Sequence, residues 1–158
     1  MTLANNFEEI LIAFNKHKVE YIIAGGYAVI FHGYGRTMGD INLWIKPENK
    51  INKDKIIQSL RNLNVNEDTL IQLNSLGFTT PIMFIDGEEP FKIDFMTSIS
   101  GVDFNEAWGQ KINAMLDGIL IPFINLNHLI ISKTTTGRRQ DKMDIEQLQK
   151  IQTLKNIK

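Results

Sequence analysis

The sequence contains no cysteine, no long apolar run and no recognisable export signal. The absence of cysteine excludes disulfide bonds and thiolate metal sites. No apolar stretch approaches the roughly 20 residues that a membrane-spanning helix needs. The first residues lack the basic segment and the small-residue cleavage site of a secretory signal. We therefore expect a cytoplasmic protein without a membrane partner.

The chain also lacks an excess of charge of either sign. Its 17 lysine and arginine residues and 18 aspartate and glutamate residues give a net charge of -1. Such a balance provides no long-range attraction to nucleic acids or membranes. A polyanionic partner would therefore have to meet a local basic patch.

The size and composition are those of an ordinary globular protein. The chain has 158 residues, of which 43% are hydrophobic and 22% are charged. This length provides enough interior for a hydrophobic core. No repeat, linker or low-complexity tract divides the sequence, so residues 1–158 are predicted to form a single domain.

The spacing of apolar residues predicts a mixture of helices and antiparallel strands, which is typical of an α+β domain. A first helix is predicted from Phe7 to about Lys16, Asp117-Gly118 is a strong hairpin signal, and Gly137 is expected to separate the last two helices. The strands are predicted at 19–24, 40–45, 80–86, 91–97, 112–116 and 119–123, and the further helices at 27–32, 56–63, 67–76, 103–108, 125–136 and 139–155.

Three separate features carry candidate chemistry. Gly25 and Gly26 lie between a predicted buried strand and a helix, where a bare backbone can approach an anion closely. Asp40 and Asn42 alternate along a strand, so both oxygen-bearing side chains face the same way and could hold a hard cation. Asp94, on the polar face of a later strand, could add a third oxygen ligand or act as a base. Taken singly, each feature is better explained by a tight turn or by polar side chains that face water.

The order of these features is more informative than any one of them. The segment AGGYA at 24–28 is followed by HGYGRTMGDINLWI at 32–45, by KIDF at 92–95, and by a basic stretch between 129 and 144. This arrangement resembles the active-site signature of the nucleotidyltransferase superfamily, the DNA polymerase beta-like fold. It is most similar to small bacterial nucleotidyltransferase-like proteins that lie close to the nucleotidyltransferase toxins of toxin–antitoxin pairs. The resemblance covers roughly residues 19–150.

The resemblance implies a nucleotidyltransferase fold, with a mixed central sheet flanked by helices and a helical C-terminal segment. It implies a reaction in which an acceptor hydroxyl attacks the α-phosphate of a nucleoside triphosphate and pyrophosphate leaves. One metal ion would lower the pKa of the hydroxyl and a second would stabilise the leaving oxygens.

The resemblance also assigns roles to individual residues. Gly25 and Gly26 would bind the triphosphate through backbone N–H groups. Magnesium or manganese would be held by Asp40, Asn42 and Asp94, and Asp94 would help to activate the acceptor hydroxyl. The remaining substrate-binding positions, whose cations would neutralise phosphates, are Arg36, Lys133, Arg138 and Arg139.

Position 42 departs from the family pattern, which has aspartate there. Asn42 has nearly the same shape but removes one negative charge from a site that must hold two divalent cations. A neutral amide oxygen binds magnesium more weakly than a carboxylate does. We therefore hypothesise that the chain binds nucleotide or metal poorly, or binds without turnover. A pseudoenzyme, an enzyme of reduced activity and a deliberately inactivated variant are all compatible with this residue.

Other polar and aromatic residues have competing interpretations. Gly137 could turn the chain so that Lys133 and Arg138 point at one place, but these cations could instead be solvated or pair with Asp141 and Asp144. Two other residues near the predicted site, His32 and Trp44, are predicted to have packing roles.

Two functions follow for the whole chain. The leading hypothesis is a metal-dependent nucleotidyltransferase whose acceptor is RNA, such as tRNA, or a protein. The alternative is a non-catalytic nucleotide-binding domain, or an antitoxin-binding partner with the same fold. A net charge of -1 requires any RNA acceptor to bind a local basic patch.

Overall fold

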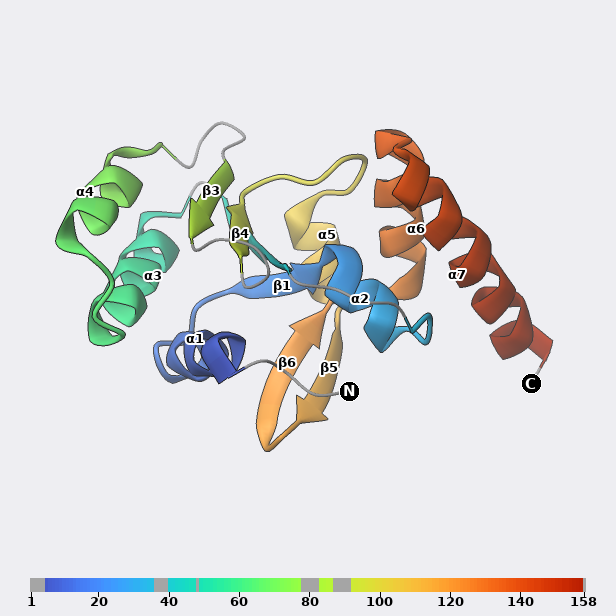
Figure 1. Ribbon diagram of the computed structural model, residues 1–158, viewed down its shortest axis with the longest axis horizontal. Helices are drawn as coiled ribbons and strands as arrows, with labels where there is room; N and C mark the ends of the chain where they lie inside the picture. The colour runs from blue at the N-terminus through green and yellow to red at the C-terminus, as the bar shows by residue number, and fades with distance from the viewer. Residues whose placement is uncertain (1–4, 36–39, 48, 78–82, 87–91, 158) are drawn as a thin grey trace.

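The computed structural model describes residues 5–35, 40–47, 49–77, 83–86 and 92–157. Seven helices and six strands lie within these ranges (Figure 1). In chain order they are α1 (Asn5–Lys16), β1 (Tyr21–Ala24), α2 (Gly25–Phe31), β2 (Ile41–Ile45), α3 (Lys50–Asn62), α4 (Glu67–Ser75), β3 (Met83–Asp86), β4 (Ile93–Met96), α5 (Phe104–Gly109), β5 (Ile112–Leu116), β6 (Ile119–Phe123), α6 (Leu126–Thr136) and α7 (Arg139–Ile157).

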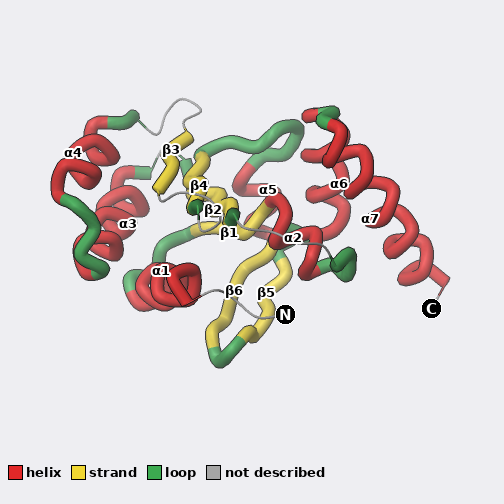
Figure 2. Tube along the Cα trace, in the orientation of Figure 1, coloured by secondary structure: helices red, strands yellow, loops and turns green. Residues whose placement is uncertain are grey.

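The six strands form one mixed sheet in the order β3-β4-β2-β1-β6-β5. The central strand β1 pairs antiparallel with β2 and parallel with β6, and β2 pairs parallel with β4. The outer strands β3 and β5 are antiparallel to their neighbours. The predicted α+β fold with a mixed central sheet and a helical C-terminal segment is therefore confirmed (Figure 2).

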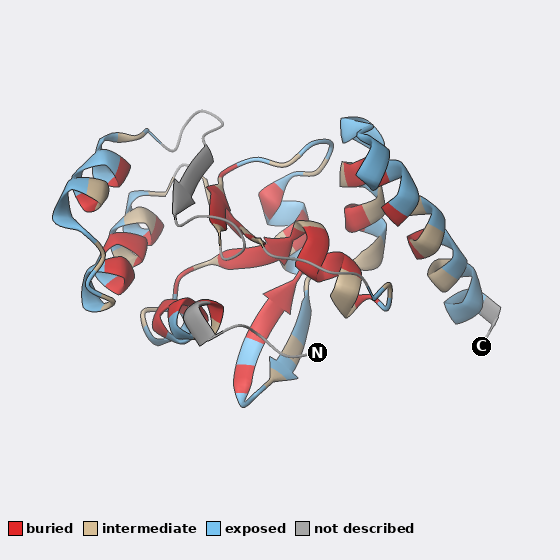
Figure 3. Cartoon of the chain, in the orientation of Figure 1, coloured by how far each residue is buried: buried red, intermediate tan, exposed pale blue. Residues whose placement is uncertain are grey.

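Helices cover both faces of the sheet. On one face, the Phe14 ring of α1 lies 5.5 Å from that of Tyr21 and 6.1 Å from that of Phe95. On the other face, the Phe104 ring of α5 meets the Trp44 ring edge-on at 5.1 Å. Trp44 is therefore a core residue, as predicted from the sequence, and α5 covers the sheet face that also carries Asn42. Burial is concentrated in the central strands, whereas β5 is largely exposed (Figure 3).

Turn and cap residues fix the ends of several elements. The β5–β6 hairpin turns at Asp117 and Gly118, which have φ angles of 50° and 80° and join strands with the predicted bounds. The side chain of Asn125 accepts a hydrogen bond from the His128 backbone N–H at 2.7 Å and caps the start of α6. Gly137, with a φ of 65°, ends α6 in the left-handed conformation that glycine adopts at little cost.

Some predicted boundaries were wrong. Helix α2 begins at Gly25 rather than at Tyr27, because Gly25 takes a φ of 64° and turns the chain directly from strand to helix. Strand β2 begins at Ile41, so Asp40 precedes the strand rather than forming part of it. The predicted strand at 91–97 is confined to Ile93–Met96, and part of the predicted strand at 80–86 lies outside the described residues. None of the helices in the described ranges is both long and apolar enough to cross a bilayer.

Candidate functional site

The ends of three neighbouring strands bring the predicted site residues together. Asn42 on β2 lies opposite Ala24 on β1 and opposite Asp94 on β4. Gly25 follows Ala24 directly, so the strand-to-helix turn lies beside the polar side chains. Residues 40–42 and 92–94, which are distant in sequence, therefore meet at one edge of the sheet face that α5 covers.

Gly25 and Asn42 are in direct contact. A Cβ atom added to Gly25 would lie 2.0 Å from Asn42 Nδ2 and 2.8 Å from its Cγ. The positive φ of Gly25 separately disfavours any residue with a side chain. Position 25 therefore requires glycine both for its conformation and for the space that the Asn42 side chain occupies.

Lys92 lies between the two carboxylates of this site. Its Nζ is 3.4 Å from Asp40 Oδ2 and 3.7 Å from Asp94 Oδ1. The Asp40 and Asp94 Oδ1 atoms are buried and accept no hydrogen bond in the part of the chain that the structure describes. We call Asp40, Asn42, Lys92 and Asp94 the sheet-end cluster.

Asp94 is the most deeply buried carboxylate of the sheet-end cluster, with 6% of its surface exposed. Burial raises the pKa of the Asp94 carboxyl, the positive charge of Lys92 opposes that effect, and the negative charge of Asp40 adds to it. The folded protein therefore disfavours the ionised form of Asp94 relative to a carboxylate in water. Such a carboxylate is suited to accept a proton or a cation.

The donor atoms of the sheet-end cluster are compatible with a magnesium or manganese ion. Two carboxylates and one amide supply hard oxygen ligands, and the two Oδ1 atoms accept no hydrogen bond from the described residues. Within the described ranges no three histidine, cysteine or carboxylate side chains gather into a metal-binding group, and position 42 carries an amide. The residues therefore fit a divalent ion, with fewer charged ligands than the family pattern has.

A cavity of about 250 Å³ extends from the sheet-end cluster towards α6 and α7. Gly25, Asn42 and Asp94 line it on the sheet side, and Lys133 and Arg138 line it on the helix side. Between these walls the lining includes four hydroxyl side chains, which belong to Ser98, Ser100, Ser132 and Thr136.

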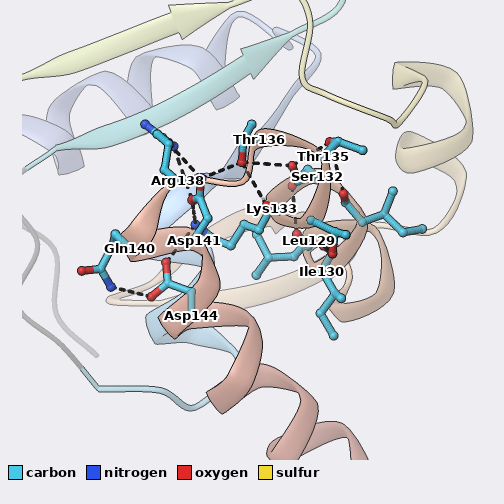
Figure 4. Close-up of polar contacts among 12 residues, drawn as sticks. Leu129, Ile130, Ser132, Lys133, Thr135, Thr136, Arg138, Gln140, Asp141 and Asp144 are labelled. Atoms are coloured by element: carbon cyan, nitrogen blue, oxygen red, sulfur yellow. Dashed lines mark hydrogen bonds and ion pairs between the residues drawn. The ribbon is translucent and has the colours of Figure 1, made fainter.

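The basic residues on the helix side of the cavity are joined to two aspartates by ion pairs and hydrogen bonds (Figure 4). Lys133 Nζ lies 3.3 Å from Asp141 Oδ1 and 3.0 Å from Asp144 Oδ2. The Arg138 Nε and Thr136 Oγ1 atoms donate hydrogen bonds to Asp141 Oδ2 at 2.9 Å and 2.6 Å. We call Lys133, Arg138, Asp141 and Asp144 the helix cluster. Its lysine and both aspartates are buried.

Asp141 is the centre of the helix cluster. Burial acts to raise the pKa of its carboxyl, but hydrogen bonds from Arg138 and Thr136 and the charges of Lys133 and Arg138 outweigh burial and lower the pKa to about 2. The same hydrogen bond and charge raise the pKa of the Arg138 guanidinium. Lys133 and Arg138 are therefore already neutralised by aspartates, which is the pairing that the sequence left open.

The structure brings together most, but not all, of the residues predicted from the sequence. Gly25, Asn42, Asp94, Lys133 and Arg138 line one cavity, and Asp40 joins them through Lys92. Gly26 and Arg139 are not among the residues that line this cavity: Gly26 is buried inside α2, and Arg139 is exposed at the start of α7. Arg36 lies outside the described residues.

Two contacts were not foreseen. Lys92 shares a strand face with Asp94 in the sequence pattern, but its position between two carboxylates depends on the pairing of β2 with β4. The hydroxyls of Ser98 and Ser100 reach the cavity from an irregular segment that has no sequence signal. His32 is buried and its Nε2 lies 2.8 Å from the Ile124 carbonyl oxygen, in agreement with its predicted packing role.

Comparison with known proteins supports the fold. The family DUF6036, described as a nucleotidyltransferase of unknown function, matches residues 1–155. No curated protein shows significant similarity to the chain. A crystal structure of the lincosamide antibiotic adenylyltransferase LnuA, with lincomycin bound, superimposes with a TM-score of 0.57 and 18% sequence identity, over 95% of this chain and 98% of that chain. At this identity the likeness shows the nucleotidyltransferase fold alone.

Proposed function

Because the chain belongs to the DUF6036 family of nucleotidyltransferases, we propose that it transfers a nucleoside monophosphate from a nucleoside triphosphate to an acceptor hydroxyl at the cavity beside Asn42 and Asp94. The observation that carries this proposal is the meeting of Gly25, Asn42 and Asp94 at adjacent strand ends on the wall of one cavity. The bare backbone at Gly25 allows a phosphate to approach closely.

Magnesium or manganese would be held by Asp40, Asn42 and Asp94. When bound, it supplies positive charge that favours ionisation of the acceptor hydroxyl and stabilises the charge on the phosphates. The Oδ1 atoms of Asp40 and Asp94, which are buried and accept no hydrogen bond from the described residues, support this assignment.

In the proposed reaction, the acceptor oxygen forms a bond to the α-phosphorus as the bond to the pyrophosphate oxygen breaks. Asp94 accepts the proton of the acceptor hydroxyl, and its raised pKa suits it to this role. Arg138, whose side chain is 76% exposed, is the cation of the helix cluster best placed to reach the departing phosphates. Lys133 would act on them from the cavity wall while Asp141 and Asp144 hold it in place. The implied phosphate contacts of Gly26, Arg36 and Arg139 would complete the nucleotide site.

Asn42 limits this activity. The sheet-end cluster has two carboxylates and one ammonium, whereas an aspartate at position 42 would provide a third carboxylate. Electrostatic attraction for divalent ions is therefore weaker than in the family pattern. This same observation favours a second candidate function, in which the chain binds nucleotide without transferring it.

A transfer assay tests the proposal. The chain and its Asn42→Asp variant would be incubated with each α-labelled nucleoside triphosphate, magnesium or manganese, and acceptors that include total tRNA, a cell extract and lincomycin. Lincomycin is included because LnuA, which has a similar fold, is solved with it bound. The matched control is Asn42→Asp combined with Asp94→Asn.

We expect Asn42→Asp to label an acceptor at least about tenfold faster than the parent chain, because the added charge strengthens metal binding. We expect Asp94→Asn to abolish that gain. If Asn42→Asp and the parent both bind a nucleoside triphosphate but neither labels an acceptor, the non-catalytic function replaces the catalytic one. If neither binds a triphosphate, both functions fail.

A further inference from the structure

The Lys92 ammonium lies where a cation bound by the carboxylates of the sheet-end cluster would lie. The ammonium is within 4 Å of both carboxylates, and Lys92 directly precedes β4, the strand that carries Asp94. The side chain is 25% exposed, so it lies at the mouth of the site rather than inside the core. An ammonium therefore balances part of the charge of Asp40 and Asp94.

An ammonium and a divalent ion compete for the same two carboxylates. Two cations within a few ångströms of each other repel strongly wherever water is partly excluded. Lys92 has a long and flexible stem, so it can move its ammonium towards solvent when another cation arrives. The motion costs the free energy of the ion pairs with Asp40 and Asp94, and this cost lowers the affinity for the metal.

Asn42 makes the competition more severe. With an amide at position 42, the two carboxylates that pair with Lys92 are the only charged ligands among the three metal-binding positions of the site. Asp94, which is 6% exposed, still provides a buried carboxylate ligand for an ion.

We infer that Lys92 is a built-in counter-cation of the sheet-end cluster, which must leave Asp40 and Asp94 before a divalent ion binds and which therefore sets the metal affinity of the site. The inference rests on the proposed function, because that function supplies the metal. It goes further by naming a residue of this chain that opposes metal loading.

Metal binding can be measured without any transfer reaction. The free Mn²⁺ signal in electron paramagnetic resonance disappears when the ion binds, so a titration of the full chain yields a dissociation constant. The variant is Lys92→Met, which keeps the length and apolar stem of the side chain and removes the ammonium. The matched control is Lys46→Met, which removes the same charge from the other end of β2, where Lys46 pairs with Glu20 at 3.1 Å and with similar exposure.

We expect Lys92→Met to bind Mn²⁺ at least about tenfold more tightly than the parent, because the competing charge is gone. Lys46→Met and Lys92→Arg should stay within about threefold of the parent, since Lys46 is remote and arginine keeps the charge. Adding Asp94→Asn to Lys92→Met should remove the gain. Circular dichroism confirms folding, and Lys92→Gln replaces Lys92→Met, with the same expectation, if the methionine variant does not fold.

A Lys92→Met variant that binds Mn²⁺ no more tightly than Lys46→Met overturns the inference, whatever the transfer assay shows. Labelling by Asn42→Asp together with unchanged binding in Lys92→Met would overturn the inference and leave the proposed function standing. Tighter binding in Lys92→Met, with no labelling by any variant, would support the inference and overturn the catalytic function.

Discussion

The sheet-end cluster and the helix cluster face the same cavity. The first combines two aspartates with one lysine and the second combines two aspartates with a lysine and an arginine, yet the carboxylate oxygens of the two clusters differ in how many hydrogen bonds they accept. In the helix cluster, the two oxygens of Asp141 accept hydrogen bonds from Lys133, Arg138 and Thr136. In the sheet-end cluster, one oxygen of Asp40 and one of Asp94 are buried and accept no hydrogen bond from the residues that the structure describes. A buried polar group without a partner costs free energy, so natural proteins keep such groups where they bind something.

The buried charged residues of the two clusters have different roles. The helix cluster joins the end of α6 to the start of α7 and holds the cations of the cavity wall in fixed positions. The sheet-end cluster has spare ligand capacity and one displaceable ammonium. We therefore expect substitutions in the helix cluster to change mainly the stability of the fold, and substitutions in the sheet-end cluster to change mainly binding.

The largest expected effect follows from removal of the buried ammonium of the helix cluster. Lys133→Met would leave Asp141 and Asp144, which are 1% and 0% exposed, without their shared cation. Breaking a buried ion pair on one side costs about 3–5 kcal/mol, and urea denaturation followed by circular dichroism would measure the loss. Lys50→Met, which breaks an exposed pair with Asp54, is the control and should change the free energy of unfolding by less than about 1 kcal/mol. Equal effects for the two variants would contradict the structural role of the helix cluster.

The acid stability of the fold provides an intermediate effect. The folded state lowers the pKa of Asp141 to about 2, so its contribution to stability is present above the ordinary aspartate pKa and is lost as the pH falls from about 4 towards 2. We expect Asp141 to account for roughly 2 kcal/mol of this loss. Thermal unfolding of Asp141→Asn between pH 2 and pH 7 should show a weaker acid dependence than the parent. An unchanged slope would show that Asp141 is not the group that titrates.

The smallest expected effect has the opposite sign and comes from the sheet-end cluster. The folded state raises the pKa of Asp94, so the contribution of this group is favourable below its ordinary pKa and is lost as the pH rises through its folded pKa. Asp94→Asn should therefore leave stability at pH 7 unchanged or raise it by up to about 1 kcal/mol, while it weakens Mn²⁺ binding. Urea denaturation at pH 7 and at pH 4 would measure the difference between the two conditions. A loss of more than about 1 kcal/mol at pH 7 would mean that Asp94 is a structural residue like Asp141.

The sequence by itself determined where the main strands and the hairpin turn lie and which family the chain belongs to. A run of apolar residues predicted β1 and alternating apolar residues predicted β2 and β4. Asp117-Gly118 predicted the β5–β6 hairpin with its observed bounds, because these signals depend on the conformations of neighbouring residues. The order of the glycine pair, Asp40, Asn42 and Asp94 was enough to indicate a nucleotidyltransferase.

Only the tertiary structure decided which charges meet. Lys92 lies between Asp40 and Asp94 because β2 and β4 are parallel neighbours, and no local pattern specifies that pairing. The neutralisation of Lys133 by Asp141 and Asp144 likewise depends on how α7 packs against α6 after Gly137. Local sequence sets backbone conformation over a few residues, whereas the electrostatic state of a buried group depends on every chain segment packed around it.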